Sequence, residues 1–171
     1  MSCRFFRDIG MERAEERTEV PAFTEFADRV FPGLEKGGFH AAYYQVLEAF
    51  ARGRIRRLMV TIPPQHGKSL GSTTLLPAYM LGLDPDLKIA IASYSAALAN
   101  RFNKRVQRIM DSALYRALFP GTSIKRAGER SDYVRTADMA EVIGCSGELL
   151  SVGREGSLTG NRVDVFILDD L

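Results

Sequence analysis

The sequence has no tryptophan, only two cysteines and two histidines among its 171 residues, and no long apolar run. Cys3 and Cys145 form no Cys-x-x-Cys pair, which argues against a disulfide framework or a zinc site and fits a reducing cytosol. His40 and His66 lack a supporting cluster of metal ligands, so we expect no zinc centre and no catalysis through histidine. No apolar run approaches the ~20 residues of a membrane helix, and Met1 to Arg17 lack the apolar stretch of a secretory signal. We therefore expect a cytoplasmic protein without a membrane segment.

The charge balance also excludes a strongly basic protein. Net charge is only +2, so any contact with nucleic acid has to come from local clusters of basic residues. The length and the 46% share of hydrophobic residues suit one globular domain with a core. We expect a charge-rich arm at residues 1–21, followed by a single domain over residues 22–171.

Hydrophobic periodicity predicts alternating helices and strands. Helical spacing of apolar residues predicts amphipathic helices, and short apolar runs with β-branched residues predict buried strands. A hairpin with its reversal at residues 136–140 is also expected, whereas the glycine-rich residues 149–161 show no helical period. This alternation is typical of an α/β fold with a mostly parallel sheet and flanking helices. The expected helices span residues 23–31, 39–51, 68–81 and 96–110, with a further piece to 118, and the expected strands span 58–62, 88–93, 133–136, 141–145 and 163–168.

The central motif lies between an expected strand and an expected helix. The P-loop pattern Gly-x4-Gly-Lys-Ser/Thr turns backbone N–H groups and a helix N-terminus toward phosphate oxygens. Here Gly67-Lys68-Ser69 matches its end, but Ile62 stands where the first glycine should be. Lys68 is the candidate for contact with the β- and γ-phosphates, and Ser69 for ligation of Mg²⁺. The alternative is a helix N-terminus beside a surface lysine. The candidate nucleotide-binding residues of the loop are Pro64, Gln65, His66, Gly67, Lys68 and Ser69.

Two acids follow the last expected strand. Asp169 and Asp170 come directly after four apolar residues, at the C-terminal edge where open α/β sheets bind ligands. Asp169 is the candidate Mg²⁺ residue, and Asp170 is the candidate base that activates the attacking water. The alternative is a polar turn or a helix N-cap, since aspartate favours both. The position 100 residues after Ser69, in this strand context, favours the carboxylate pair.

Seven stretches in a fixed order carry a family resemblance. They are Phe39-His40 with Val46–Ala49, Arg56–Leu58, Pro63–Ser69, Ser93–Ala96, Tyr115–Pro120, Gly156–Gly160 and Asp164–Asp170. With them the chain resembles the N-terminal ATPase region of large terminase subunits of tailed phages and prophages, over residues 22–171. The resemblance implies a P-loop NTPase that hydrolyses ATP with Mg²⁺ and drives double-stranded DNA into a procapsid in the bacterial cytoplasm. It also implies the portal protein, the small terminase subunit and a ring of identical subunits as partners.

The resemblance extends to single residues. It implies that Gln45 contacts adenine and that an arginine before the last strand reaches a neighbouring subunit's phosphate. Arg162 is near the right place for that arginine, and Arg154 is the alternative. The chain departs from many relatives in having Gln65 where they have arginine, and Asp170 where they have glutamate.

Two arginine-rich clusters and the chain's end leave alternatives open. Helix 96–110 carries a basic stripe, which contacts DNA phosphates or an adjacent subunit, or is a solvated face. The bases at residues 52–57 allow the same interpretations. The alternative functions are another P-loop motor such as a helicase, and a non-enzymatic, nucleotide-binding remnant. Because the sequence stops at Leu171, we expect an incomplete sheet with an open apolar edge and face, weak ATP binding without turnover, and self-association. The basic stripe consists of Arg101, Lys104, Arg105 and Arg108.

Overall fold

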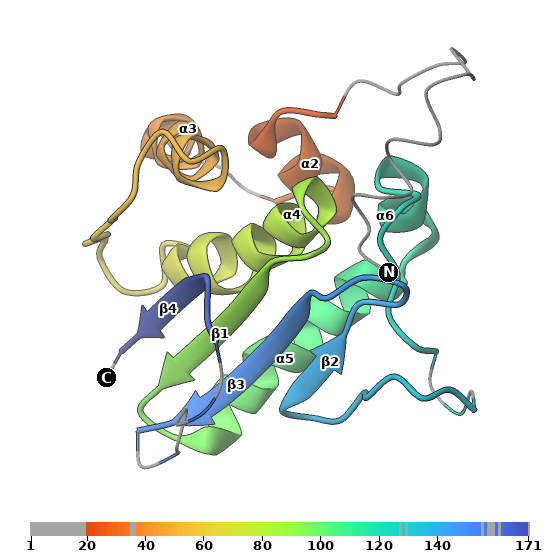
Figure 1. Cartoon of the computed structure of the whole chain (residues 1–171). Helices are drawn as coiled ribbons and strands as arrows, with labels where there is room; N and C mark the ends of the chain where they lie inside the picture. Colours follow the sequence, from red (N-terminus) through yellow and green to blue (C-terminus); the bar gives the residue numbers. More distant parts are fainter. Residues whose placement is uncertain are drawn as a thin grey trace.

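The computed structural model describes residues 20–170, apart from 35–36, 127, 129, 155, 157–159 and 161. The expected arm at residues 1–21 falls almost entirely outside them. The described part is an α/β structure with one four-stranded mixed sheet and flanking helices (Figure 1). Its elements are α2 (Phe23–Val30), α3 (Gly38–Ala51), the π-helix η1 (Leu70–Leu75), α4 (Leu76–Leu83), β1 (Lys88–Ser93), α5 (Ala96–Asp111), α6 (Ala113–Leu118), β2 (Met139–Glu141), β3 (Glu148–Gly153) and β4 (Val165–Asp169).

The sheet brings the ends of three parallel strands into line. Its order is β2-β3-β1-β4, in which β1 pairs in parallel with β3 and β4, and β2 pairs antiparallel with β3. Ser93, the last residue of β1, lies opposite Gly153 on one side and Asp169 on the other. Residues that follow these strands therefore share one edge of the sheet.

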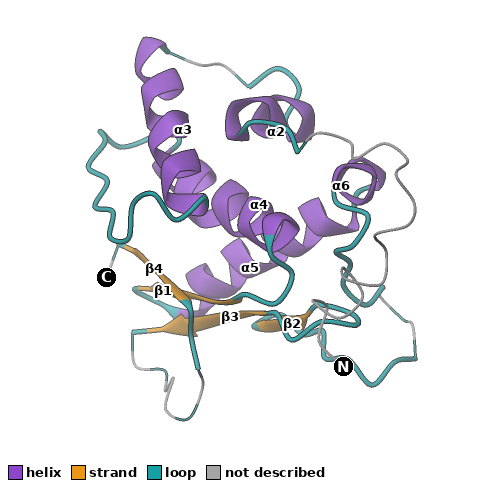
Figure 2. Cartoon of the chain, turned by 45° about the horizontal axis from the view of Figure 1, so that its top comes forward, coloured by secondary structure: helices purple, strands orange, loops and turns teal. Residues whose placement is uncertain are grey.

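The described helices lie on one side of the sheet (Figure 2). Helix α5 packs against β3 and β1, and α4 with η1 packs against α5. An aromatic cluster of Phe23, Phe26, Tyr79, Tyr115 and Phe119 joins α2, α4 and α6 in the core, with ring centroids 5.0 to 6.3 Å apart. The tyrosine hydroxyls in it each find a hydrogen-bond partner, as buried hydroxyls require. Within the described ranges, no helix is long and apolar enough to span a membrane.

The helices of the sequence-based prediction are confirmed, with small differences at their ends, and the one expected over 68–81 has π geometry over Leu70–Leu75 before it continues as α4. Helix α5 spans residues 96–111, and its expected apolar stripe is buried at Phe102, Val106 and Ile109. The same buried side also contains Asn103 and Gln107, which the apolar pattern does not show. Their amide groups donate to backbone carbonyls of Leu149 and Thr136, so they tie β3 and the chain before β2 to α5.

Two expectations about strands need correction, and one strand was not expected. Residues 58–62 form no strand, because a β-branched run becomes a strand only where its backbone finds a partner. The hairpin expected over 133–145 is only partly formed. Its reversal at 136–140 is present, with one antiparallel bridge between Arg135 and Ala140, but the regular ladder lies between β2 and β3, with Gly144 at φ +74° in their reversal. The glycine-rich stretch from residue 149 contains most of β3. The side chains of Leu149 and Ser151 are buried, and those of their neighbours along the strand are only partly buried. The strands expected at 88–93 and 163–168 are confirmed as β1 and, shifted by a residue or two, β4.

Two further observations concern the sheet surface and the cysteines. Phe166 and Leu168 on β4 expose 49% and 57% of their surface. Cys145 is disulfide-bonded, which corrects the expectation that the cysteines stay reduced.

Candidate functional site

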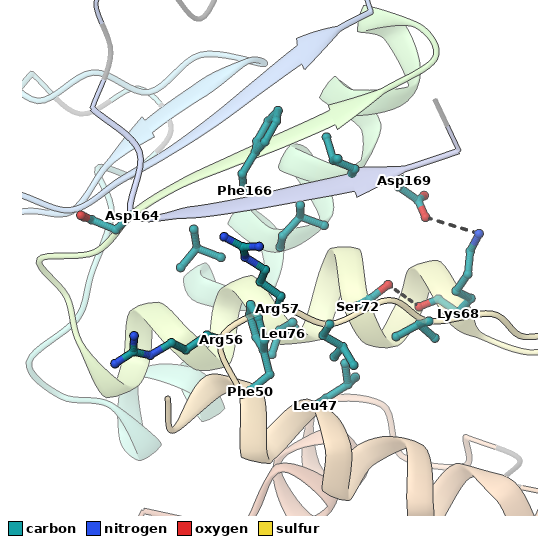
Figure 3. Close-up of a pocket in the computed structure, with 15 residues that line it drawn as sticks. Leu47, Phe50, Arg56, Arg57, Lys68, Ser72, Leu76, Asp164, Phe166 and Asp169 are labelled. Carbon is teal, nitrogen blue, oxygen red and sulfur yellow. Dashed lines mark hydrogen bonds and ion pairs between the residues drawn. The ribbon is translucent and has the colours of Figure 1, made fainter. Parts of the chain in front are cut away.

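The loop of residues 62–69 meets the C-terminal end of β4 (Figure 3). The Lys68 ammonium donates a hydrogen bond to Asp170 Oδ1 at 2.5 Å and lies 3.9 Å from Asp169 Oδ1. The Ser69 hydroxyl donates to Asp169 Oδ1 at 3.2 Å. These partners are 100 and 102 residues apart in the sequence. The fold thus joins the two motifs that the sequence analysis singled out separately.

The backbone of loop 62–69 turns sharply before the helix begins. Gln65 and Gly67 have φ angles of +63° and +77°, a region that favours glycine. Lys68 and Ser69 open the helical run, and the Gly67 carbonyl accepts a hydrogen bond from Gly71 N–H at 2.9 Å. The loop encloses a cavity of about 400 Å³, large enough for a phosphate chain. Its lining is Ile62, Pro63, Pro64, Gln65, Gly67, Lys68, Ser69, Leu70 and Asp170.

The electrostatics at this edge combine a buried acid with a partly exposed ammonium. Asp169 is only 3% exposed, and burial raises its pKa above the ordinary range, against the opposing effects of Ser69 and Lys68. Its neighbour Asp170 has a side chain 68% exposed. The hydrogen bond to Asp170 raises the pKa of Lys68, so the ammonium is charged at neutral pH. The buried carboxylate therefore lies where additional positive charge would be stabilising.

The oxygen donors at the site suit a hard divalent cation. Magnesium prefers carboxylate, hydroxyl, phosphate and water oxygens, and usually takes only one or two protein ligands. The Ser69 hydroxyl and the Asp169 carboxylate, in mutual contact, provide two such donors. Among the residues described, no group of three or more His, Cys, Asp or Glu side chains could hold a metal by itself. A cation here would therefore depend on phosphate and water oxygens for its remaining ligands.

Helix α3 contacts the loop from its outer side, a feature that the sequence analysis missed. The Tyr43 hydroxyl donates to the Lys68 carbonyl at 2.7 Å, and His40 Nε2 lies 3.2 Å from the His66 carbonyl. Burial raises the pKa of Tyr43 to about 12, so its hydroxyl remains a donor at neutral pH. The only sequence signal was that both residues fall on the buried stripe of an amphipathic helix, which normally indicates core packing.

Some candidate residues do not reach the loop. Gln45 is exposed on the side of α3 away from His40 and Tyr43. Arg162 precedes β4, at the end of the strand opposite to Asp169, and pairs with Asp164 at 3.2 Å. By contrast, Arg154 directly follows β3 and so lies on the same sheet edge as Asp169. The side chain of His66 turns back, with Nδ1 2.7 Å from the Pro64 carbonyl.

A second cavity of about 430 Å³ lies beside the site, between β4 and the chain before the loop. Figure 3 shows Leu47, Phe50 and Leu76 on one side of it and β4 on the other. Arg56 and Arg57 also line it. The basic stripe of α5 is exposed at all four of its positions, Arg101, Lys104, Arg105 and Arg108.

Comparison with known proteins adds no relative. No family model, no curated protein and no solved structure matches the chain.

Proposed function

We propose that the chain binds ATP with Mg²⁺ at loop 62–69 and belongs to a P-loop ATPase. The observation that carries the proposal is the meeting of Lys68 and Ser69 with Asp169 and Asp170 at the end of β4. A loop ending in Gly-Lys-Ser, an adjoining cavity and a buried carboxylate are the parts that phosphoryl transfer requires. A lysine at a helix N-terminus would account for the first part alone, but not for the two acids 100 residues later in the sequence.

Each residue has a distinct task in this proposal. Lys68 turns from Asp170 to the β- and γ-phosphates, where its charge offsets the charge of the transferring group. Ser69 and Asp169 would hold Mg²⁺, which would supply positive charge to offset that of the phosphates. Asp170, which is exposed and can meet water, accepts the proton of the attacking water. The water oxygen bonds to the γ-phosphorus as the bond to the bridging oxygen breaks, which leaves ADP and phosphate.

The biological role follows from the ordered resemblance to large terminase subunits. We propose that the hydrolysis drives double-stranded DNA into a phage procapsid, with the portal protein, the small terminase subunit and identical subunits as partners. The exposed basic stripe on α5 supports a role in contact with DNA or with a neighbouring subunit. An arginine supplied by that neighbour would complete the site. The two candidates are Arg162, which precedes β4, and Arg154, which follows β3 on the same sheet edge as Asp169.

The test is phosphate release by the longest natural protein that contains this sequence, with Mg²⁺ and ATP, in the presence and absence of double-stranded DNA. We expect release that DNA stimulates and that Lys68→Ala abolishes. Lys88→Ala is the matched control, since Lys88 pairs with Glu148 at the opposite edge of the sheet. Hydrolysis that Lys68→Ala leaves unchanged, in a variant with normal circular dichroism, would refute the proposal.

A further inference from the structure

Two side chains of α3 contact backbone carbonyl groups of loop 62–69. His40 Nε2 lies 3.2 Å from the His66 carbonyl, and the Tyr43 hydroxyl donates to the Lys68 carbonyl at 2.7 Å. These residues are three apart on a helix, so they project from the same side of α3. Both contacts join segments 25 or 26 residues apart in the sequence.

The shortest contact of His40 assigns its tautomer. Gly37 N–H donates to His40 Nδ1 at 2.8 Å, whereas the Gly37 carbonyl lies farther from Nδ1, at 3.3 Å, so we assign Nδ1 as the acceptor nitrogen. A neutral imidazole with an acceptor at Nδ1 carries its proton on Nε2. That proton is the only one that can serve the His66 carbonyl, which accepts and never donates. The side chain therefore links the start of α3 to the loop through a donor of fixed position.

Holding these carbonyls fixes the direction of two N–H groups. In a trans peptide, the carbonyl of one residue and the N–H of the next point in opposite directions. With the His66 carbonyl held against α3, the Gly67 N–H points away from α3. The Lys68 carbonyl fixes the Ser69 N–H in the same way. N–H groups aimed at one place are what a loop needs to bind phosphate oxygens.

The space beside Tyr43 is tight. A Cβ at Gly71 would lie 2.6 Å from the Tyr43 ring, whereas a Cβ at Gly67 would lie 3.5 Å from His40 Nε2, an ordinary contact distance. The Tyr43 side chain is buried, and its ring lies 5.6 Å from that of Tyr44. The loop and α3 thus fit together with little freedom to slide.

From this geometry we infer that His40 and Tyr43 are positioning residues of the nucleotide site, which set the phosphate-facing N–H groups of the loop. The inference rests on the proposed function, since it assigns these residues to ATP binding. Neither side chain touches the phosphates. His40 and Tyr43 act through the backbone carbonyls of the loop. Lys68 and Ser69, by contrast, act through their side chains.

The first experiment compares two tyrosine variants by hydrogen exchange and by titration with Mg²⁺-ATP. Tyr43→Phe removes the shorter of the two side-chain hydrogen bonds to the Lys68 carbonyl, at 2.7 Å, and leaves that of the Ser72 hydroxyl at 2.9 Å. Tyr115→Phe is its matched control, because the Tyr115 hydroxyl donates to the Ala78 carbonyl at 2.8 Å, in the core away from the loop. Tyr43→Phe should speed exchange at the amides of residues 67–69 and weaken ATP binding about fivefold, the factor that corresponds to a hydrogen bond of about 1 kcal/mol. The control should alter neither.

The second experiment separates the two nitrogens of His40. His40→Gln places an amide N–H near the position of Nε2 and should retain ATP binding to within about twofold. His40→Asn keeps an acceptor near Nδ1 but has no donor that reaches the His66 carbonyl. It should weaken binding by about the same factor as Tyr43→Phe. Equal affinities for the Gln and Asn variants would contradict the inference.

The outcomes distinguish the inference from the proposed function. If the wild-type protein does not bind ATP, or if Lys68→Ala binds as well as wild type, the proposed function fails and the inference fails with it. If wild type binds and Lys68→Ala does not, while Tyr43→Phe matches wild type in exchange and affinity, only the inference is refuted.

Discussion

Replacement of Gly71 by alanine should affect both stability and nucleotide binding. Gly71 lies in η1, two residues after the loop, and its Cα faces the ring of Tyr43. An alanine Cβ would lie 2.6 Å from Tyr43 Cε1 and 2.8 Å from the hydroxyl oxygen, whereas ordinary contacts begin near 3.4 Å. The ring would have to retreat by most of an ångström, and its hydroxyl would leave the Lys68 carbonyl.

The size of the effect follows from the packing around Tyr43. The side chain is 6% exposed and therefore has no solvent-filled space to enter. Overpacking of this kind costs about 1–3 kcal/mol. Alanine regains roughly 0.5–1 kcal/mol over glycine inside a helix. We expect a net loss of about 1–2 kcal/mol in the free energy of unfolding, or roughly 2–8 °C in Tm. The displaced hydroxyl should weaken Mg²⁺-ATP binding about fivefold as well.

Thermal unfolding and ATP titration of three glycine variants would measure this. Gly82→Ala is matched for the clash, because its Cβ would lie 2.6 Å from the Phe119 ring, away from the loop. It should lose similar stability but bind ATP normally. Gly38→Ala, in the first turn of α3, has no atom within 4 Å and should be neutral or slightly stabilising. If Gly71→Ala melts and binds like wild type, the contact between Tyr43 and the loop is not as described.

Three other predictions concern the acids and the basic stripe. Because burial raises the pKa of Asp169 above 3.8, the folded state keeps a proton that the unfolded state has lost, and stability falls as pH rises from 3.8 through the folded-state pKa. Asp169→Asn should therefore gain stability relative to wild type as pH rises through this window, and it should lose Mg²⁺-dependent ATP binding. If the difference in free energy of unfolding between the variant and wild type does not change with pH, the carboxylate is not desolvated. Asp170→Asn should keep binding and lower turnover by roughly 10²-fold or more, and normal turnover would place the base elsewhere. Lys104→Ala with Arg105→Ala should reduce the slope of log affinity for DNA against log salt by about one unit per lost contact, whereas an unchanged slope would indicate a solvated face.

Local patterns predicted the helices and the two motifs that form the site, the loop ending in Gly67-Lys68-Ser69 and the pair Asp169-Asp170. Helical periodicity and such motifs are short-range features of a sequence. The strand expected at residues 58–62 shows where this fails. Its composition is right for a strand, but pairing depends on a neighbour that local sequence does not specify. Strand β3 was missed for the opposite reason. Ser151 and Gly153 are poor apolar signals, and their places are decided by Asn100 and the N-terminus of α5, which contact them across the fold.

The candidate site divides in the same way. Lys68, Ser69, Asp169 and Asp170 could be predicted because each belongs to a recognisable run of residues. The part played by Tyr43 could not, since its hydroxyl acts on a backbone carbonyl 25 residues later and leaves no pattern in the sequence. Arg154 lies at the same end of the sheet as Asp169. This placement depends on the order of the strands, which becomes known only with the fold.

Calorimetric titration of Mg²⁺-ATP into the wild-type chain and into Lys68→Ala tests the central claim most directly. Lys68 is the one cation that contacts both acids at the end of β4 in the described part of the chain. We expect one binding site in the wild type, a loss of at least tenfold in affinity in Lys68→Ala, and normal binding in Lys88→Ala. Equal binding by wild type and Lys68→Ala, or the absence of binding in the wild type, would contradict the account.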